Sequence, residues 1–218
     1  LHGPFSGTTP LEVPFDWNLS EMSLPVGTEL VFRAEATDAY DLGDPHVGQS
    51  AALTLTVVSS KAKQDDIGSR QAALFRELAA VLDRQRIAHN HVTDLNIQWD
   101  TTQQFRSSEI DLLLDVEFNQ RHITSQLAAD EDGLATQARQ LADELLRNQL
   151  DDPAAQRHLR RISEDLDQLK QDTLPPLGQA LSDARRHVRQ NEASPENSPA
   201  ASGLGAPLKT AQRHQQTV

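Results

Sequence analysis

Three aspartates in one turn-rich segment are the first side chains whose spacing could support chemistry. Asp38, Asp41 and Asp44 lie close together beside the end of a predicted strand. Clustered carboxylate oxygens can bind Ca²⁺, so these residues are candidate calcium ligands. Their spacing matches no EF-hand loop, and aspartate is also common in turns because its side chain bonds to nearby backbone groups. The turn interpretation is favoured, and we predict no metal or other cofactor.

The histidines and glutamates of the second half do not form a catalytic or metal-binding pattern. His89 and His91 are two residues apart, and on a helix such neighbours point about 200° away from each other. Glu117 and His122 suggest the di-iron sites of four-helix bundles, but those sites need a Glu-x-x-His motif, which the sequence lacks. Signatures of serine hydrolases and phosphate-binding loops are also absent, as is cysteine. We therefore predict that the protein is not an enzyme.

Charge and composition narrow the classes of partner. The formal net charge of −12 disfavours binding to nucleic acid or to anionic membrane surfaces, because both need an excess of lysine and arginine. No apolar run is long enough to span a bilayer, so this segment is not expected to insert into a membrane. The aromatic content of 4% suits helices that bury a narrow apolar stripe.

The spacing of the apolar residues, and with it the predicted type of secondary structure, changes near residue 60. Up to Val58 apolar residues alternate in steps of two, which predicts strands at about residues 11–19, 30–37 and 51–58. From about Asp66 they recur in steps of three and four, which predicts long amphipathic helices. The fold class is mainly α with a small β part. The predicted domains are a β module over 1–60, a coiled-coil-like bundle of antiparallel helices over 61–192, and a disordered tail over 193–218.

The predicted helices cover about 66–98, 108–129, 134–149 and 153–191. Asp152 and Pro153 form a strong helix start, and Pro175-Pro176 should kink or end the last helix. The tail is expected to be disordered because its composition is dominated by Ser, Pro, Ala, Gly and Gln.

Apolar seams on these helices are the candidate interaction residues. They recur at heptad-like spacing and consist of Leu74, Leu78, Val81, Val92, Leu95, Leu159, Ile162, Leu166 and Leu169. The seams could pack antiparallel helices of one chain or form an intermolecular coiled coil. Short connections favour packing within one chain. Gln85 interrupts the first seam, where a polar residue weakens a dry core and can set register.

Two stretches resemble known proteins. The segment Leu24-Pro25-Val26-Gly27-Thr28-Glu29-Leu30-Val31-Phe32, continued to Asp38, and Gly48-Gln49-Ser50 with the strand to Val58 resemble the closing strands of a bacterial immunoglobulin-like domain. The segments Asn148-Gln149-Leu150-Asp151-Asp152-Pro153 and Asp172-Thr173-Leu174-Pro175-Pro176-Leu177 resemble long coiled-coil proteins of the bacterial envelope. In that poorly characterised group, N-terminal membrane helices precede an immunoglobulin-like domain and long helices.

The resemblance implies a partial immunoglobulin-like module at 1–60. Since such a sandwich needs about seven strands, either the missing strands lie N-terminal to Leu1, which we favour, or the module packs on the helices. The resemblance also implies a membrane-anchored parent protein and a periplasmic or extracytoplasmic location in the cell envelope, and it implies no activity. We therefore expect a structural or protein-interaction module that binds a protein partner or self-associates through its helices. The alternative is an immunoglobulin-like module that binds a glycan or a protein, with a helical spacer.

Overall fold

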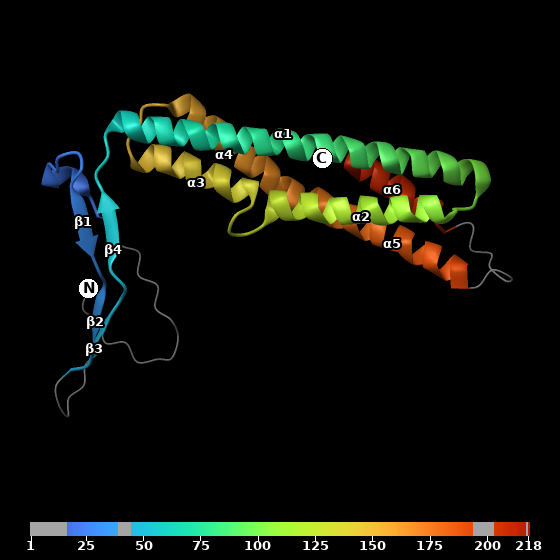
Figure 1. Cartoon of the computed structure of the whole chain (residues 1–218), viewed down its shortest axis with the longest axis horizontal. Coiled ribbons are helices and arrows are strands. Elements are labelled where there is room, and N and C mark those ends of the chain that lie inside the picture. Colours follow the sequence, from blue (N-terminus) through green and yellow to red (C-terminus); the bar gives the residue numbers. More distant parts are fainter. Residues whose placement is uncertain (1–16, 39–44, 194–202, 217) are drawn as a thin grey trace. The chain divides into compact units, whose positions relative to one another are not determined.

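The computed structural model describes residues 17–38, 45–193, 203–216 and 218 (Figure 1). The chain is mainly helical, with short antiparallel strands, and divides into two compact units, Leu1–Lys63 and Gln64–Val218. Each unit is described by itself below.

The first unit contains a two-stranded antiparallel ribbon. Strand β1 pairs with β4, and β2 pairs with β3. The elements are the 3-10 helix η1 (Leu19–Met22), β1 (Glu29–Phe32), β2 (Glu35–Thr37), β3 (Val47–Gln49) and β4 (Leu53–Thr56). The predicted strand at 30–37 is thus split in two, and the predicted loop at 38–48 contributes part of β3. Of the predicted strand at 11–19, most lies outside the described residues, and its end begins η1 instead.

A bulge separates the two halves of the ribbon. Residues 33–34 on one side lie opposite 50–52 on the other, so the second side has one extra residue. The backbone N–H of Ser50 donates to the carbonyl of Ala34 at 2.9 Å, and the N–H of Ala34 donates to the Ser50 hydroxyl at 2.9 Å. The serine side chain therefore supplies the acceptor that the bulge removes from the ladder.

The second unit is a bundle of long helices, as predicted. The helices are α1 (Ser60–Thr102, whose first turn belongs to the first unit), α2 (Ser107–Ala128), α3 (Leu134–Arg147), α4 (Pro153–Gln168), α5 (Leu174–Ala193) and α6 (Gly205–Gln215). The predicted start at Asp152-Pro153 is confirmed, because the Asp152 carboxylate accepts from the N–H of Ala155 at 2.9 Å.

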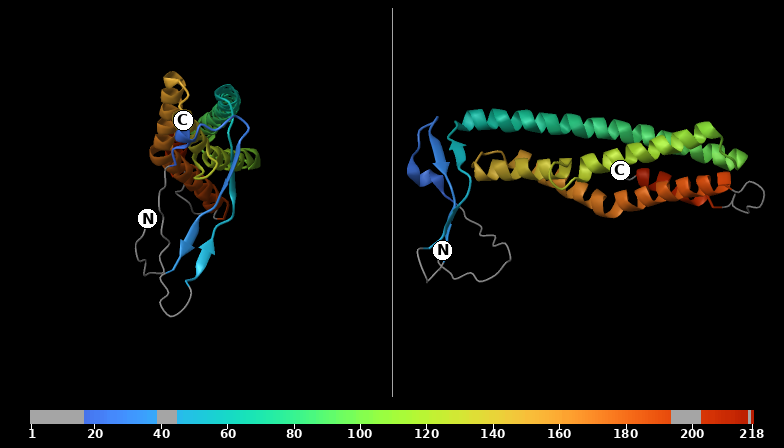
Figure 2. Two further views of the ribbon diagram at one scale, coloured as in Figure 1. Left: turned by 90° about the vertical axis from the view of Figure 1, so that its left-hand side faces the viewer. Right: turned by 60° about the horizontal axis from the view of Figure 1, so that its bottom comes forward.

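Two apolar cores follow one another along the bundle. The first joins the N-terminal half of α1, the end of α2, and α3 with α4. The second joins the C-terminal half of α1, the start of α2, and α5 with α6. Figures 1 and 2 show α1 running past both groups of helices. Because α1 has 43 residues and extends roughly 65 Å, it contributes to both cores.

Helices α4 and α5 are joined without a loop. Between them lies η2 (Leu169–Thr173), a π-helical segment in which the N–H of Leu174 bonds to the carbonyl of Leu169. The helix continues through Pro175-Pro176, so the prolines do not end it, and the bend at this point is visible in Figure 2. Lys170 of η2 pairs with Asp130 at 2.6 Å, and this contact lowers the pKa of the Asp130 carboxyl.

The predicted disordered tail is wrong for residues 205–215, which form α6. Leu204, Leu208 and Ala211 are spaced by four and three residues and are fully buried in the second core. Three apolar anchors on one face are enough to dock a short helix onto a groove that already exists. The surrounding Ser, Pro and Gln composition concealed this stripe in the sequence.

Candidate functional site

The predicted acidic loop is only partly described. The Asp38 carboxylate accepts from the backbone N–H of His46 and lies 2.8 Å from its Nδ1. Asp41 and Asp44 lie outside the described residues. Across the parts of the chain that the structure describes, no three His, Cys, Asp or Glu side chains gather in a way that could hold a metal ion. His89 and His91 are half-buried.

The predicted seam residues all face the interior of the second unit. Six are buried, namely Leu74, Val81, Val92, Leu95, Leu159 and Leu166, while Leu78, Ile162 and Leu169 are half-buried against the first core. The seams therefore pack helices of one chain together, the arrangement that short connections favoured. A partner that binds this unit must use other side chains or displace one of the helices.

Buried polar side chains separate the two cores. On α1, the first core ends at Val81 and the second core begins at Val92, and Gln85 lies between them. On α2, Glu117 and Gln120 occupy the corresponding interval, between the residues of the second core and those of the first. We call Gln85, Glu117, Gln120 and Gln215 the polar layer. All four are at most 4% exposed.

Glu117 is the charged member of this layer. Its carboxylate accepts from the Arg121 guanidinium one turn later, from Arg185 at 3.1 Å and from the Ser182 hydroxyl at 3.3 Å. Arg185 and Ser182 come from α5, so these bonds tie α2 to α5. A buried carboxylate is tolerable here because it has both charge partners and hydrogen bonds.

Gln85 and Gln215 connect α1 to α6. The Gln85 amide donates to the backbone carbonyl of Gln215 at 3.5 Å. The Gln85 Oε1 atom and both side-chain polar atoms of Gln215 are buried without a hydrogen-bond partner among the described residues. The prediction that Gln85 interrupts a dry seam is therefore confirmed.

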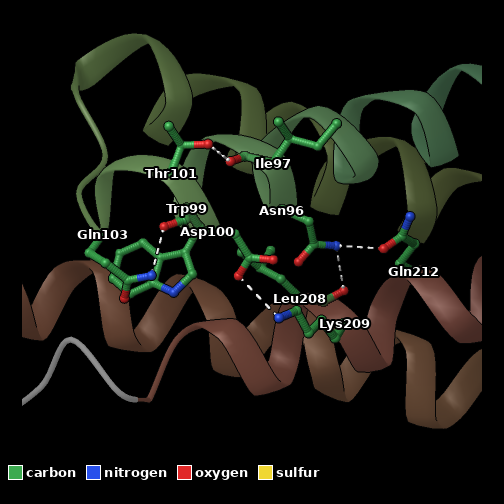
Figure 3. A network of polar contacts seen from close by, with 9 residues as sticks. All are labelled: Asn96, Ile97, Trp99, Asp100, Thr101, Gln103, Leu208, Lys209 and Gln212. Carbon is green, nitrogen blue, oxygen red and sulfur yellow. Dashed lines mark hydrogen bonds and ion pairs between the residues drawn. The ribbon is translucent and has the colours of Figure 1, made fainter.

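A second polar contact between α1 and α6 lies further along (Figure 3). The Asn96 amide donates to the carbonyl of Leu208 at 3.3 Å and to Oε1 of Gln212 at 3.0 Å. At the surface, Lys209 pairs with Asp100 at 3.0 Å. These bonds fix where α6 lies along α1, in addition to its apolar anchors.

The first unit offers a different kind of surface. Because directly paired residues project to the same face of a sheet, Leu30, Phe32, Leu53 and Leu55 share one face of the ribbon. Trp17 packs edge-on against Phe32, with 5.9 Å between ring centroids. Leu53 is nevertheless 58% exposed and Leu55 43% exposed. We call these residues, with Trp17, the apolar ribbon face.

Sequence reasoning missed Glu117 and Gln120 as buried positions, although the signal was present. Gln120 is four residues after Val116 and three before Ile123, so it lies on the apolar stripe of α2. A polar residue on an apolar stripe is expected to be either exposed at the edge of the stripe or buried with it, and Gln120 is buried. The alternation of apolar residues in 51–58 did predict that Leu53 and Leu55 share one face of a strand.

Comparison with known proteins yields no match to any protein family, any curated protein or any solved structure. The resemblance to envelope proteins thus stays a prediction. Among the described helices, none combines the length and the apolar content that crossing a membrane requires.

Proposed function

We propose that this chain is a non-catalytic protein-interaction module, in which the ribbon binds a partner and the helical bundle is a self-contained support. The single observation that carries the proposal is the apolar ribbon face. An isolated two-stranded ribbon is at best marginally stable in water and needs a third strand or a packed partner. Here large side chains on one face remain open to solvent in the described structure.

The partner that fits this face is another β-sheet layer. Stacked sheets pack face to face through alternating apolar side chains. The opposite face of the β1–β4 pair carries Glu29, Val31, Thr54 and Thr56, a largely polar set that suits contact with water. This asymmetry is that of one half of a sandwich, which agrees with the proposed immunoglobulin-like origin of the module.

The helical unit supports a structural role more than recognition. Its seams are filled by its own helices, whereas Leu53 and Leu55 on the apolar ribbon face are 58% and 43% exposed. On the resemblance alone, we further propose that the module belongs to a membrane-anchored protein and works on the extracytoplasmic side of the bacterial envelope.

Site-specific photo-crosslinking tests the interaction. A benzophenone amino acid would replace Leu53 on the apolar ribbon face or, as the matched control, its neighbour Thr54 on the opposite face. Both positions are exposed and adjacent, so they differ mainly in the face that they present. We expect a discrete crosslinked protein from position 53 and none from position 54, in cells that make the protein at native level. Equal crosslinking from both positions, or none from 53, would contradict the proposal.

A further inference from the structure

Helix α6 covers a groove between α1 and α5 with three apolar side chains. Leu204, Leu208 and Ala211 are fully buried and belong to the second core. The second-core residues that form the walls are spaced by three and four on each helix, so those of one helix share a face. We call these residues the α6 groove, namely Val92, Leu95 and Trp99 of α1 with Ala184 and Val188 of α5. Two long helices thus form the groove, and α6 adds only a short apolar stripe to it.

Few interactions hold α6 in this groove. It is the shortest α-helix that the structure describes, with 11 residues, and a helix of this length is marginal in water unless packing stabilises it. Its polar contacts with α1 include the hydrogen bonds from Asn96 and the ion pair of Lys209 with Asp100 (Figure 3). The ion pair is exposed and therefore contributes little. We expect α6 to belong to the least stable part of the fold, which opens locally before the rest.

Polar atoms between α1 and α6 are left without partners. Oε1 of Gln85, Oδ1 of Asn96 and both side-chain polar atoms of Gln215 are buried without a hydrogen-bond partner among the described residues. The two α1 side chains point toward α6, because each donates to a backbone carbonyl of that helix. A buried oxygen without a donor is costly. A helix with N–H or O–H side chains at these positions would therefore fit the α1 side of the groove better than α6 does.

Cavities at both ends of α6 show that it does not fill the groove. One cavity of about 270 Å³ is lined by Leu204 together with Trp99 and Val188 of the groove. Another of about 200 Å³ is lined by Gln215 and Val218 together with side chains of α1. Side chains that border such spaces lose packing contacts. An occupant with a larger first anchor than Leu204, or with a longer helix beyond the position of Gln215, would bury more surface in the groove.

The charge of α6 differs from that of the chain as a whole. Between Gly205 and Gln215 the helix carries Lys209 and Arg213 but no aspartate or glutamate, whereas the whole chain has a formal net charge of −12. Lys209 reaches Asp100 of α1 at 3.0 Å. Complementary charge of this kind promotes encounter and sets specificity more than it tightens binding. The groove therefore favours a basic helix over an acidic one.

We propose that the α6 groove binds a basic, amphipathic helix of a partner protein, and that α6 is a displaceable occupant of the same site. The partner helix carries apolar side chains at positions i, i+4 and i+7, in the register of Leu204, Leu208 and Ala211. In the resting chain α6 closes the groove, so the groove becomes an interaction surface only when α6 leaves. The site lies in the helical unit and does not depend on the function proposed for the ribbon.

Titration of the full chain with fluorescently labelled peptides, followed by anisotropy, tests the proposal. The first peptide has the sequence of residues 203–218. The second peptide also carries Leu204→Phe, whose larger ring can enter the adjoining cavity of about 270 Å³. The wild-type chain is compared with its Leu208→Asp variant, in which α6 should detach because the aspartate would be buried.

We expect the first peptide to bind the Leu208→Asp chain with a dissociation constant on the order of 100 µM. It should bind the wild type about tenfold more weakly, because tethered α6 competes at an effective concentration of about 1 mM. Leu204→Phe in the peptide should tighten binding to either chain about threefold, since it buries more apolar surface. In a Trp17→Phe background Trp99 is the only tryptophan, and its emission from the Leu208→Asp chain should shift to shorter wavelength as the peptide covers it.

Matched controls locate the binding. A peptide with Leu208→Asp should not bind, because it has lost its central anchor. A peptide in which both Lys209 and Arg213 are replaced by glutamate should bind about tenfold more weakly. For the protein, Leu146→Asp adds the same charge at an exposed position of α3, so this variant should bind the peptides as the wild type does.

The proposal is overturned if the Leu208→Asp chain binds the first peptide no more tightly than the wild type does, or if the Leu208→Asp peptide binds equally well. Circular dichroism checks that the variant chain keeps its helices. If it does not, the wild type alone decides, and a lack of saturable binding of the Leu204→Phe peptide up to about 3 mM overturns the proposal. Wild-type dimers that form with rising concentration in sedimentation, and are absent from Leu208→Asp, would assign the groove to α6 of a second copy and would overturn its assignment to another protein.

Discussion

Replacing Leu159 with alanine tests whether α4 packs in the first core. Leu159 is 0% exposed and belongs to the cluster that joins α3 and α4. The substitution removes three carbon atoms, which corresponds to roughly 2.4 kcal/mol at about 0.8 kcal/mol for each buried methylene. The cavity that remains adds to this loss, because surrounding helices relax only partly. We therefore expect a destabilisation of about 3–5 kcal/mol.

Urea unfolding followed by circular dichroism at 222 nm measures this change, because nearly all helices lie in the second unit. The matched control is Leu146→Ala on α3, where the side chain is 57% exposed and the loss should stay within about 0.5 kcal/mol. Similar losses for the two variants, or a loss below about 0.5 kcal/mol for Leu159→Ala, would refute this packing. The seam would then be open to a partner helix.

Three further predictions concern local features. Gly178→Ala should raise the unfolding free energy by about 0.5–1 kcal/mol, because the added Cβ meets no atom within 4 Å and alanine favours a helix. Gly133→Ala should lower it by about 1–3 kcal/mol, because the added Cβ would lie 2.4 Å from the Ala129 carbonyl oxygen. Urea melts in which both variants changed the unfolding free energy in the same direction would contradict this. The pKa of Glu109 is lowered, chiefly because the backbone N–H of Arg106 donates to its carboxylate, so its stabilising effect should be present at neutral pH and vanish as the pH falls through that lowered pKa. Melts of the wild type and of the Glu109→Gln variant should converge in acid, and a constant difference would show that the carboxylate is not involved. Leu208→Asp places a charge at a fully buried position and should abolish hydrogen-exchange protection in α6 while α3 keeps its protection; retained protection in α6 would refute its docking.

The long helices could be predicted from the sequence because their signals are local. A stretch free of proline, a three-and-four apolar spacing and a capping aspartate at Asp152 each act within one or two turns. The predicted boundaries at 108–129 and 134–149 accordingly lie within two residues of α2 and α3. Helix α1 is longer at both ends than the predicted 66–98. It begins at Ser60, where the Ser59 hydroxyl accepts from the N–H of Ala62 at 3.1 Å, and it ends at Thr102, just before Gln103 with a φ of 53°.

Features that depend on distant residues could not be predicted in this way. Helix α6 is stabilised by a groove formed by α1 and α5, and its own composition resembles a linker. Gln120 of α2 and Gly178 of α5 line the same pocket, although they are far apart in the chain. The pairing of β1 with β4 and of β2 with β3, with its bulge at 50–52, depends on register, which alternation alone does not specify.

The π-helical segment at 169–173 has a consequence for how this sequence can change in length. Leu159 and Leu166 continue a seven-residue repeat that would next reach Thr173 and Ala180, but the following repeat runs through Leu174 and Leu181. One additional residue thus shifts the phase between the part of the helix that serves the first core and the part that serves the second. Deleting a single residue here would bring Leu174 and Leu181 into the same seven-residue repeat as Leu159 and Leu166, so an ordinary α-helix could present both stripes to the two cores. A one-codon deletion in this segment is therefore expected to be less damaging than one in the middle of α3, where the loss of a residue turns the rest of the helix by about 100°.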